Sequence, residues 1–280
     1  MRLPFKTYQW SSSIYACQSN DLEHFQSMVD EEVSRLGMQQ NILGMIDDDP
    51  LLMYKSPAAN ANLPSVLVCA GFHGNESAAN WGILHFLSIL HPSVFKSINL
   101  TILPLINPTG FKKGYRCNRL GQDPNRGFEF VNGKPKMGDG ISEEGKILLK
   151  HAQLLQAASR SGVLSCHEDV LQDGSYIYSF EPRPSPGKFS INLRDKLTEF
   201  FPSTTESEID NCVLDNGIIL NHFDTSFEAF LVKSGARFGL CSETPAMQNF
   251  DQRILANSEL IQCFIDYFIE HPEITTDQQS

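Results

Sequence analysis

The sequence of 280 residues predicts an α/β protein, a three-layer α/β/α sandwich around a mixed, mostly parallel sheet. Short, continuous apolar runs such as residues 64–71 are typical of strands that are buried on both faces of a sheet. Segments with helical spacing of apolar residues alternate with these runs. Because no repeat or break in composition divides the chain, we expect a single domain over residues 1–280, with an N-terminal extension of about residues 1–45 packed on it.

The first expected element is a helix over residues 20–36. Asn20, with Glu23 three positions later, resembles a capping box, and Gly37 ends the helical pattern. The apolar residues of one face are Leu22, Phe25, Val29, Val33 and Leu36.

The remaining elements follow in order along the chain. Strands are expected at residues 51–55, 64–71, 98–106, 162–166, 176–180 and 238–242. Helices are expected at residues 77–90, 142–159, 188–201 and 250–270. Residues 107–140 are rich in Gly, Pro and Asn, and we expect a long ordered loop there, which in a compact domain usually serves a function. From about residue 275 we expect a frayed polar tail.

The net charge of the chain is strongly negative. It contains 22 Lys and Arg against 33 Asp and Glu, which gives a formal net charge of −11. An acidic protein repels nucleic acid backbones and anionic lipids, so we expect neither nucleic acid nor membrane as a partner. A basic cluster over residues 112–126 is better suited to a small anion.

The sequence also favours a cytoplasmic location. No run approaches the ~18 apolar residues of a membrane span, and residues 1–13 lack the apolar segment of a secretory signal. The 7 cysteines are scattered and form no Cys-x-x-Cys pair. We therefore expect buried, reduced thiols.

Side chains that bind metals follow three of the predicted strands. His73 and Glu76 come after the first buried strand, His167 after the strand at 162–166, and Glu243 after the last strand. Sites in open α/β sheets lie at the carboxyl ends of strands, so we expect these side chains to converge. Two imidazoles and a carboxylate are the ligand set of a catalytic zinc ion, and a further carboxylate can take a proton from water. The alternative for His-x-x-Glu is a surface turn with a solvated carboxylate.

The segment at residues 107–128 adds three motifs. They are an Asn-Pro-x-Gly turn that begins at Asn107, the arginine Arg116, and Asp-Pro-Asn-Arg-Gly-Phe over residues 123–128. Together with His-x-x-Glu, a distant His and a late Glu in the same order, these motifs make the chain resemble the zinc metallocarboxypeptidases of the carboxypeptidase A/B type. The ordered matches span residues 73–243. The His-Glu-Asp and Glu-Thr-Pro triplets are similar to a small bacterial branch that lacks the activation prosegment.

The resemblance implies a role for each metal-binding candidate. It implies that His73, Glu76 and His167 bind one zinc ion per chain and that Glu243 is the general base and acid. Zinc would lower the pKa of water and polarise a substrate carbonyl.

The resemblance also implies roles for three residues of the 107–128 segment. It implies that Arg116 stabilises the oxyanion, while Asn125 and Arg126 hold the terminal carboxylate of the substrate. The residue types agree, because a guanidinium binds a carboxylate bidentately and a positive group stabilises charge that develops in a tetrahedral intermediate. The alternative for both arginines is a solvated basic loop.

The chain departs from the family at one position. The family's tyrosine, about twenty residues before the general base, is absent, and Asn221, His222 and Phe223 occupy that region. That tyrosine helps to bind the terminal carboxylate, so its absence bears on affinity and specificity more than on hydrolysis. His222 is a candidate replacement, and the alternative is a surface or packing histidine.

A second specificity position follows from the resemblance. In the family, a residue about fifteen positions before the general base lines the pocket for the C-terminal side chain, and counting back from Glu243 gives Glu228. An acidic residue there favours Lys or Arg ends. The alternative is a strand residue that faces solvent.

These observations lead to one expected function and two alternatives. We expect a zinc-dependent metallocarboxypeptidase that hydrolyses the C-terminal bond of a peptide, with a preference for basic ends; its substrate is a peptide or amino-acid amide. The first alternative is a related zinc amidohydrolase, either an aspartoacylase-like N-acyl amino acid deacylase or a cell-wall peptide amidase. The second is a catalytically silent binding module that keeps the fold.

Overall fold

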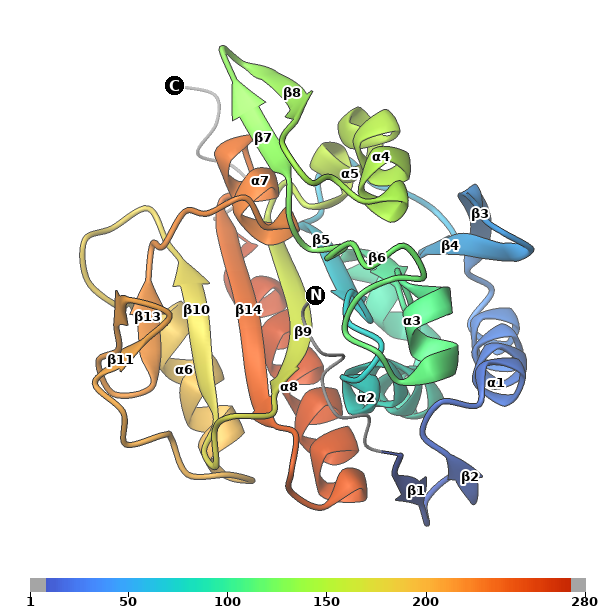
Figure 1. Ribbon diagram of the computed structural model, residues 1–280. Coiled ribbons are helices and arrows are strands. Elements are labelled where there is room, and N and C mark those ends of the chain that lie inside the picture. Colours follow the sequence, from blue (N-terminus) through green and yellow to red (C-terminus); the bar gives the residue numbers. More distant parts are fainter. Residues whose placement is uncertain (1–8, 273–280) are drawn as a thin grey trace.

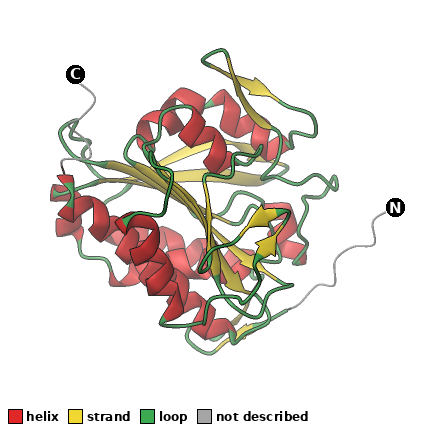
Figure 2. Ribbon diagram, turned by 90° about the vertical axis from the view of Figure 1, so that its left-hand side faces the viewer, coloured by secondary structure: helices red, strands yellow, loops and turns green. Residues whose placement is uncertain are grey.

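The computed structural model describes residues 9–272, and its centre is an eight-stranded sheet with helices on both sides (Figures 1 and 2). The strands of this sheet are β3 (Gln39–Ile46), β4 (Asp49–Lys55), β5 (Ser65–Ala70), β6 (Asn99–Leu103), β9 (Gly162–Asp169), β10 (Tyr176–Phe180), β13 (Ile218–Leu220) and β14 (Phe238–Pro245). Three two-stranded pairs accompany it: β1 (Ser11–Ser12) with β2 (Cys17–Gln18), β7 (Phe128–Val131) with β8 (Lys134–Met137), and β11 (Glu208–Ile209) with β12 (Cys212–Val213).

Eight α-helices and one short 3₁₀ helix surround the strands in the described part of the chain. They are α1 (Leu22–Arg35), α2 (Ser77–Ile89), η1 (Pro92–Lys96), α3 (Pro108–Lys113), α4 (Glu143–Lys150), α5 (Ala152–Ala158), α6 (Lys188–Thr198), α7 (Phe227–Lys233) and α8 (Phe250–Glu270).

The strand order of the main sheet is β13-β10-β14-β9-β5-β6-β4-β3. The pairs β13/β10, β14/β9, β9/β5 and β5/β6 are parallel, while β10/β14, β6/β4 and β4/β3 are antiparallel. The predicted α/β/α sandwich with a mixed, mostly parallel sheet is thus confirmed. Because β5, β9 and β14 are parallel neighbours, their carboxyl ends lie at one edge of the sheet.

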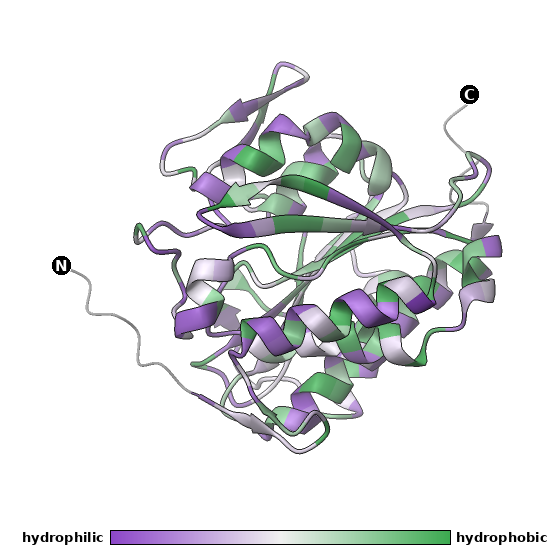
Figure 3. Cartoon of the chain, turned by 90° about the vertical axis from the view of Figure 1, so that its right-hand side faces the viewer, coloured by the Kyte–Doolittle hydropathy of each residue, from purple (hydrophilic) through white to green (hydrophobic). Residues whose placement is uncertain are grey.

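Alternate residues of the central strands face two separate apolar layers. Along β5, Val66 and Val68 pack with residues of α1, α2, α6 and α8, whereas Leu67 and Cys69 pack with residues of α4, α5 and α7. All four side chains are fully buried. This two-sided burial explains the continuous apolar run in the sequence, because successive strand residues point to opposite faces. The helices carry both hydrophilic and hydrophobic residues, as expected for outer layers (Figure 3).

The N-terminal segment packs on the helices. Helix α1 contacts α2 and α3, and β1 contacts α8. The hydroxyl of Ser12 donates a hydrogen bond of 2.8 Å to the Asp251 carboxylate in α8. Strand β3, which begins inside the predicted extension, instead joins the edge of the main sheet.

The expected capping box at Asn20 is wrong by one residue. Helix α1 is capped by Asp21, whose side chain accepts a hydrogen bond from the backbone N–H of His24. The Asn20 amide instead donates to the carbonyl oxygens of Gly74, at 3.0 Å, and Phe111, at 2.6 Å. It therefore ties the N-terminal segment to the loop that follows β5.

The expectation of one long loop over residues 107–140 is also wrong. Asn107 caps the short helix α3, which ends at Gly114 with a φ of 62°. Further along, β7 and β8 form a hairpin around Asn132 and Gly133, whose φ angles are 51° and 73°. Asn-Gly with two positive φ angles is the usual signal of a tight hairpin, and the sequence contains it.

The other expected helices and strands are present, with small shifts at their ends. The helix expected at residues 142–159 is divided at His151 into α4 and α5. The tail from residue 275 lies outside the described residues. Within residues 9–272, none of the helices combines the length and the apolar character that a transmembrane span needs.

Candidate metal centre

Three elements deliver the metal-binding candidates to one point. His73 lies in the loop after β5, Glu76 stands at the N-terminus of α2, and His167 lies in β9. The loop is held close to α3: a Cβ on Gly74 would lie 1.9 Å from the carbonyl carbon of Gly110. Only glycine permits this approach, which fixes the position of the histidine beside it.

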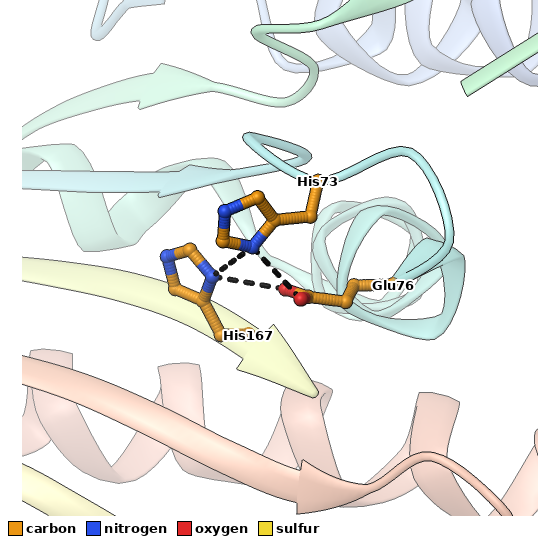
Figure 4. A group of neighbouring side chains, drawn as sticks. All are labelled: His73, Glu76 and His167. Atoms are coloured by element: carbon orange, nitrogen blue, oxygen red, sulfur yellow. Dashed lines mark hydrogen bonds and ion pairs between the residues drawn. The ribbon is translucent and has the colours of Figure 1, made fainter. Parts of the chain in front are cut away.

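The three side chains point their ligand atoms at one another (Figure 4). The Nδ1 atoms of His73 and His167 are 3.3 Å apart. The Glu76 carboxylate lies 2.8 Å from Nδ1 of His73 and 2.9 Å from Nδ1 of His167. In a tetrahedral site with zinc–nitrogen bonds of about 2.0–2.1 Å, neighbouring ligand atoms lie about 3.3 Å apart. The donor set and its spacing therefore fit a single small cation.

The charges of the group also suit a cation. Burial raises the pKa of Glu76, but His73 and His167 lower it by more, so that the net shift is downward. Burial and Arg116 lower the pKa of His73, while the Glu76 and Asp123 carboxylates raise it by more. Both rings are almost fully buried. Metal binding requires neutral imidazoles, so an ion entering this group releases any proton bound there.

Two partners of the histidines were missed in the sequence analysis. The Nε2 atom of His73 lies 3.0 Å from the Asp123 carboxylate, and that of His167 lies 2.9 Å from the Ser165 hydroxyl. Metal-binding histidines usually hydrogen bond through the second ring nitrogen, and this fixes the orientation of the ring. Two features of the sequence indicate these partners. Asp123 belongs to the Asp-Pro-Asn-Arg motif, and Ser165 lies two residues before His167 on the same strand face.

Glu243 lies beside His167 on the neighbouring strand. The two residues are register partners in the parallel pair of β14 and β9, so their side chains emerge on the same face of the sheet. Both lie inside their strands, which extend to Asp169 and Pro245, and not beyond the strand ends as expected. Burial and then the Glu76 carboxylate raise the pKa of Glu243 well above its ordinary value. A cation at the histidines would lower it again.

The two arginines do not lie in a freely solvated loop. Arg116 donates to Glu76 at 3.1 Å and to Asp123 at 3.5 Å, and its side chain is 33% exposed. Arg126 lies 3.2 Å from the Asp224 carboxylate and donates to the carbonyl of Asn125 at 2.9 Å. Both guanidinium groups thus combine carboxylate partners with access to the cleft.

Asn125 and Glu228 are buried residues of the cleft lining. The Asn125 amide donates to Glu228 at 3.3 Å, and its oxygen accepts a hydrogen bond of 2.8 Å from the backbone of Phe227. Glu228 stands in the first turn of α7 and is 4% exposed. The alternative of a strand residue facing solvent is therefore wrong for Glu228.

One cleft of about 260 Å³ gathers all eight predicted residues. They are His73, Glu76, Arg116, Asn125, Arg126, His167, Glu228 and Glu243. Tyr176 and Tyr178 of β10 also line the cleft, as does His222. Tyr176 is the register partner of Glu243 and donates a hydrogen bond of 2.8 Å to Asp169.

A buried ion pair supports the edge that carries the ligands. Glu168, next to His167, pairs with Arg253 of α8, and both side chains are fully buried. The same carboxylate accepts a hydrogen bond of 2.9 Å from the backbone N–H of Ala78, in the first turn of α2. This contact holds the beginning of α2 against β9, where Glu76 meets His167.

Comparison with known proteins places the chain in a family. The sequence model of the succinylglutamate desuccinylase/aspartoacylase catalytic domain matches residues 62–159. A crystal structure of a candidate metallopeptidase from Shewanella amazonensis is 54% identical in sequence, with a TM-score of 0.93, and the match covers 94% of this chain and 99% of that one. The chain belongs to the zinc carboxypeptidase-like superfamily.

More distant members of the zinc carboxypeptidase-like superfamily share the fold or a part of the sequence. Carboxypeptidase A from Helicoverpa armigera has a TM-score of 0.66 at 14% identity, over 96% of this chain and 77% of that one. Murein peptide amidase A from Escherichia coli K12 is 34% identical over 85 residues, which is 30% of this chain. The match spans only 33% of the amidase's own length.

Proposed function

We propose that the protein is a zinc-dependent metallocarboxypeptidase that removes the C-terminal residue of a peptide. The observation that carries the proposal is the His73–Glu76–His167 group with Glu243 on the adjacent strand, in one cleft with two arginines. The 54% identical candidate metallopeptidase supports a peptide substrate.

Zinc is the ion that we propose for the site. Two imidazole nitrogens and one carboxylate leave a fourth position open, which is the arrangement of catalytic zinc sites. Bound there, zinc supplies Lewis acidity that polarises a carbonyl and makes water more acidic. His73, Glu76 and His167 hold the ion, while Asp123 and Ser165 fix the orientation of the two rings.

Glu243 moves the proton in the proposed reaction. Its carboxylate takes a proton from the attacking water and passes it to the leaving nitrogen. Burial raises the pKa of Glu243, and Arg116 lowers it. A cation held by His73, Glu76 and His167 would lower this pKa further and favour the ionised carboxylate that the first step requires. Arg116, whose side chain remains partly exposed in the cleft, stabilises the negative oxygen of the tetrahedral intermediate.

The terminal carboxylate of the substrate binds at Arg126 in this proposal. Through Nη1, the Arg126 guanidinium contacts the carbonyl oxygen of Asn125 and the Asp224 carboxylate. The Arg126 side chain is 45% exposed to solvent. In this proposal Asn125 orients the neighbouring Arg126. The side-chain amide of Asn125 is already hydrogen bonded to Glu228 and to the backbone of α7. Glu228, which also lines the cleft, favours a Lys or Arg side chain at the C-terminus.

A second candidate function is release of an amide by a related amidohydrolase. Two observations favour it: the match to the desuccinylase/aspartoacylase domain over residues 62–159 and the 34% identity to murein peptide amidase A. Acyl amino acids or cell-wall peptides would then be the substrates.

We also propose a cytoplasmic location. The 7 cysteines, all within residues 9–272, form no disulfide bond, and Cys69, Cys166, Cys212 and Cys241 are buried, which supports a reducing compartment.

A substrate panel with and without a chelator tests the proposed function. The panel holds peptides ending in Lys, Arg or Leu, N-acyl amino acids and muropeptides. We expect release of the C-terminal residue, loss of activity with the chelator and recovery with added zinc. Hydrolysis of only the acyl amino acids or muropeptides would replace the carboxypeptidase with the second candidate, and no hydrolysis in any arm would contradict both.

The variant Glu228→Gln tests the preference for basic ends. A glutamine keeps an acceptor for Asn125 but removes the charge, so we expect kcat/KM for Lys and Arg ends to fall about 10-fold to 100-fold, the equivalent of a charged hydrogen bond of ~1.5–3 kcal/mol. The Leu-ended peptide serves as the control and should change little. An equal loss for all three peptides would contradict a role in side-chain selection.

A further inference from the structure

A tight turn separates two residues of the site. Arg116 and Asp123 contact Glu76 and His73 respectively, and residues 117–122, which include a turn over 118–122, connect them. The turn closes on itself through the backbone: the N–H of Asn118 donates to the carbonyl of Gln122 at 3.0 Å. Any movement of this turn would therefore displace both residues.

The side chain of Asn118 is the centre of the turn. Its oxygen accepts hydrogen bonds from the backbone N–H groups of Leu120 and Gln122, both at 3.0 Å. Its amide nitrogen donates to the Glu144 carboxylate at 2.8 Å. Asn118 is 5% exposed, so these bonds are shielded from water.

Glu144 anchors the turn from a different element. It lies in the first turn of α4, which Ser142 caps, and it is fully buried. Burying a carboxyl is costly unless it is hydrogen bonded, and burial raises the pKa of Glu144. Its neighbour Glu143, in contrast, is partly exposed and pairs with Arg119.

We propose that Glu144 is a positioning residue of the metal centre. Through Asn118 it fixes the turn, and through the turn it holds Asp123 against His73 and Arg116 against Glu76. The effects on turnover and on zinc retention rest on the proposed function, whereas the effect on the turn does not.

A reciprocal exchange of the two partners tests this inference. Asn118→Asp keeps the oxygen that accepts from the turn but sets a carboxyl group against Glu144. Glu144→Gln keeps an acceptor for Asn118. In the double variant the glutamine donates to the aspartate, so the bond is restored in the opposite direction. We expect Asn118→Asp to weaken zinc retention and kcat about 10-fold to 100-fold, as loss of an outer-shell partner does, and the double variant to recover most of both.

Two readouts separate positioning from general stability and from the proposed reaction. Amide hydrogen exchange over residues 118–122 of the metal-free chain should be faster in Asn118→Asp and slow again in the double variant. The rate of zinc loss to a chelator dye requires no substrate, so it remains informative if the wild type hydrolyses nothing. Glu129→Gln, which changes a glutamate paired with Lys136 in the β7–β8 hairpin and outside the turn, is the control and should resemble the wild type. Unchanged exchange and zinc retention in Asn118→Asp, or no recovery in the double variant, would overturn the inference.

Discussion

Replacing Glu243 by glutamine is expected to lower kcat by about 10²-fold to 10⁴-fold, the usual contribution of general acid–base catalysis. Glutamine has nearly the same shape but cannot take a proton from water. Because Glu243 lies beside the ligand group and is not one of its members, the variant should still retain the metal. Steady-state kinetics with metal analysis of the same sample measure both quantities.

The control for this variant is the same substitution on the surface. Glu129 pairs with Lys136 in the β7–β8 hairpin, and Glu129→Gln should leave kcat unchanged. Turnover near the wild-type rate in Glu243→Gln would remove Glu243 from the mechanism. Loss of the metal in that variant would instead assign the residue to the ligand sphere.

Replacing His167 by alanine is expected to abolish metal binding and activity together. The ring supplies one of three ligand atoms, and its removal leaves Glu76 and His73 with an incomplete set. The loss should exceed the roughly 10-fold to 100-fold effect of an outer-shell partner. Equilibrium dialysis against zinc, followed by metal analysis, gives the affinity.

The matched control for His167 is another histidine of the same cleft. His222 lines the cleft but contacts Cys212 and not the ligand group. His222→Ala should therefore keep the ion. Full zinc occupancy in His167→Ala would show that the ion binds elsewhere.

Helices and strands whose position depends on burial alone are predicted most accurately from the sequence. The helix expected at residues 250–270 has the same bounds in the structure, and the strand at residues 64–71 differs only at its ends from Ser65–Ala70. Both carry strong apolar patterns. Strand β3 was missed because it is an edge strand with Ile42 and Met45 exposed, so its sequence lacks the pattern of a buried strand.

Some residues of the candidate site could be predicted from the sequence, and others could not. His73, Glu76, His167 and Glu243 share one cleft because they follow or lie near the carboxyl ends of parallel central strands, whereas Arg116, Asn125 and Arg126 reach it from the segment between α3 and β7 and Glu228 from α7. The positions of Tyr176 and Tyr178, which also line the cleft, could not be predicted. Tyr176 stands beside Glu243 only because β10 runs antiparallel to β14, and nothing local in the sequence specifies that pairing.

The contacts that hold the site residues in place also join segments that are far apart in the sequence. The bond from Asn118 to Glu144 joins residues 26 positions apart, and the pair of Glu168 with Arg253 joins residues 85 positions apart. Such contacts depend on how helices pack on the sheet. Sequence motifs identify the groups that perform chemistry better than those that hold them.

The most direct test of the metal centre is a crystal structure of the zinc-loaded protein with anomalous data at the zinc absorption edge. Our account predicts a single strong peak about 2.0–2.2 Å from Nδ1 of His73, Nδ1 of His167 and the Glu76 carboxylate. A protein saturated with zinc but without density among these three side chains would contradict it.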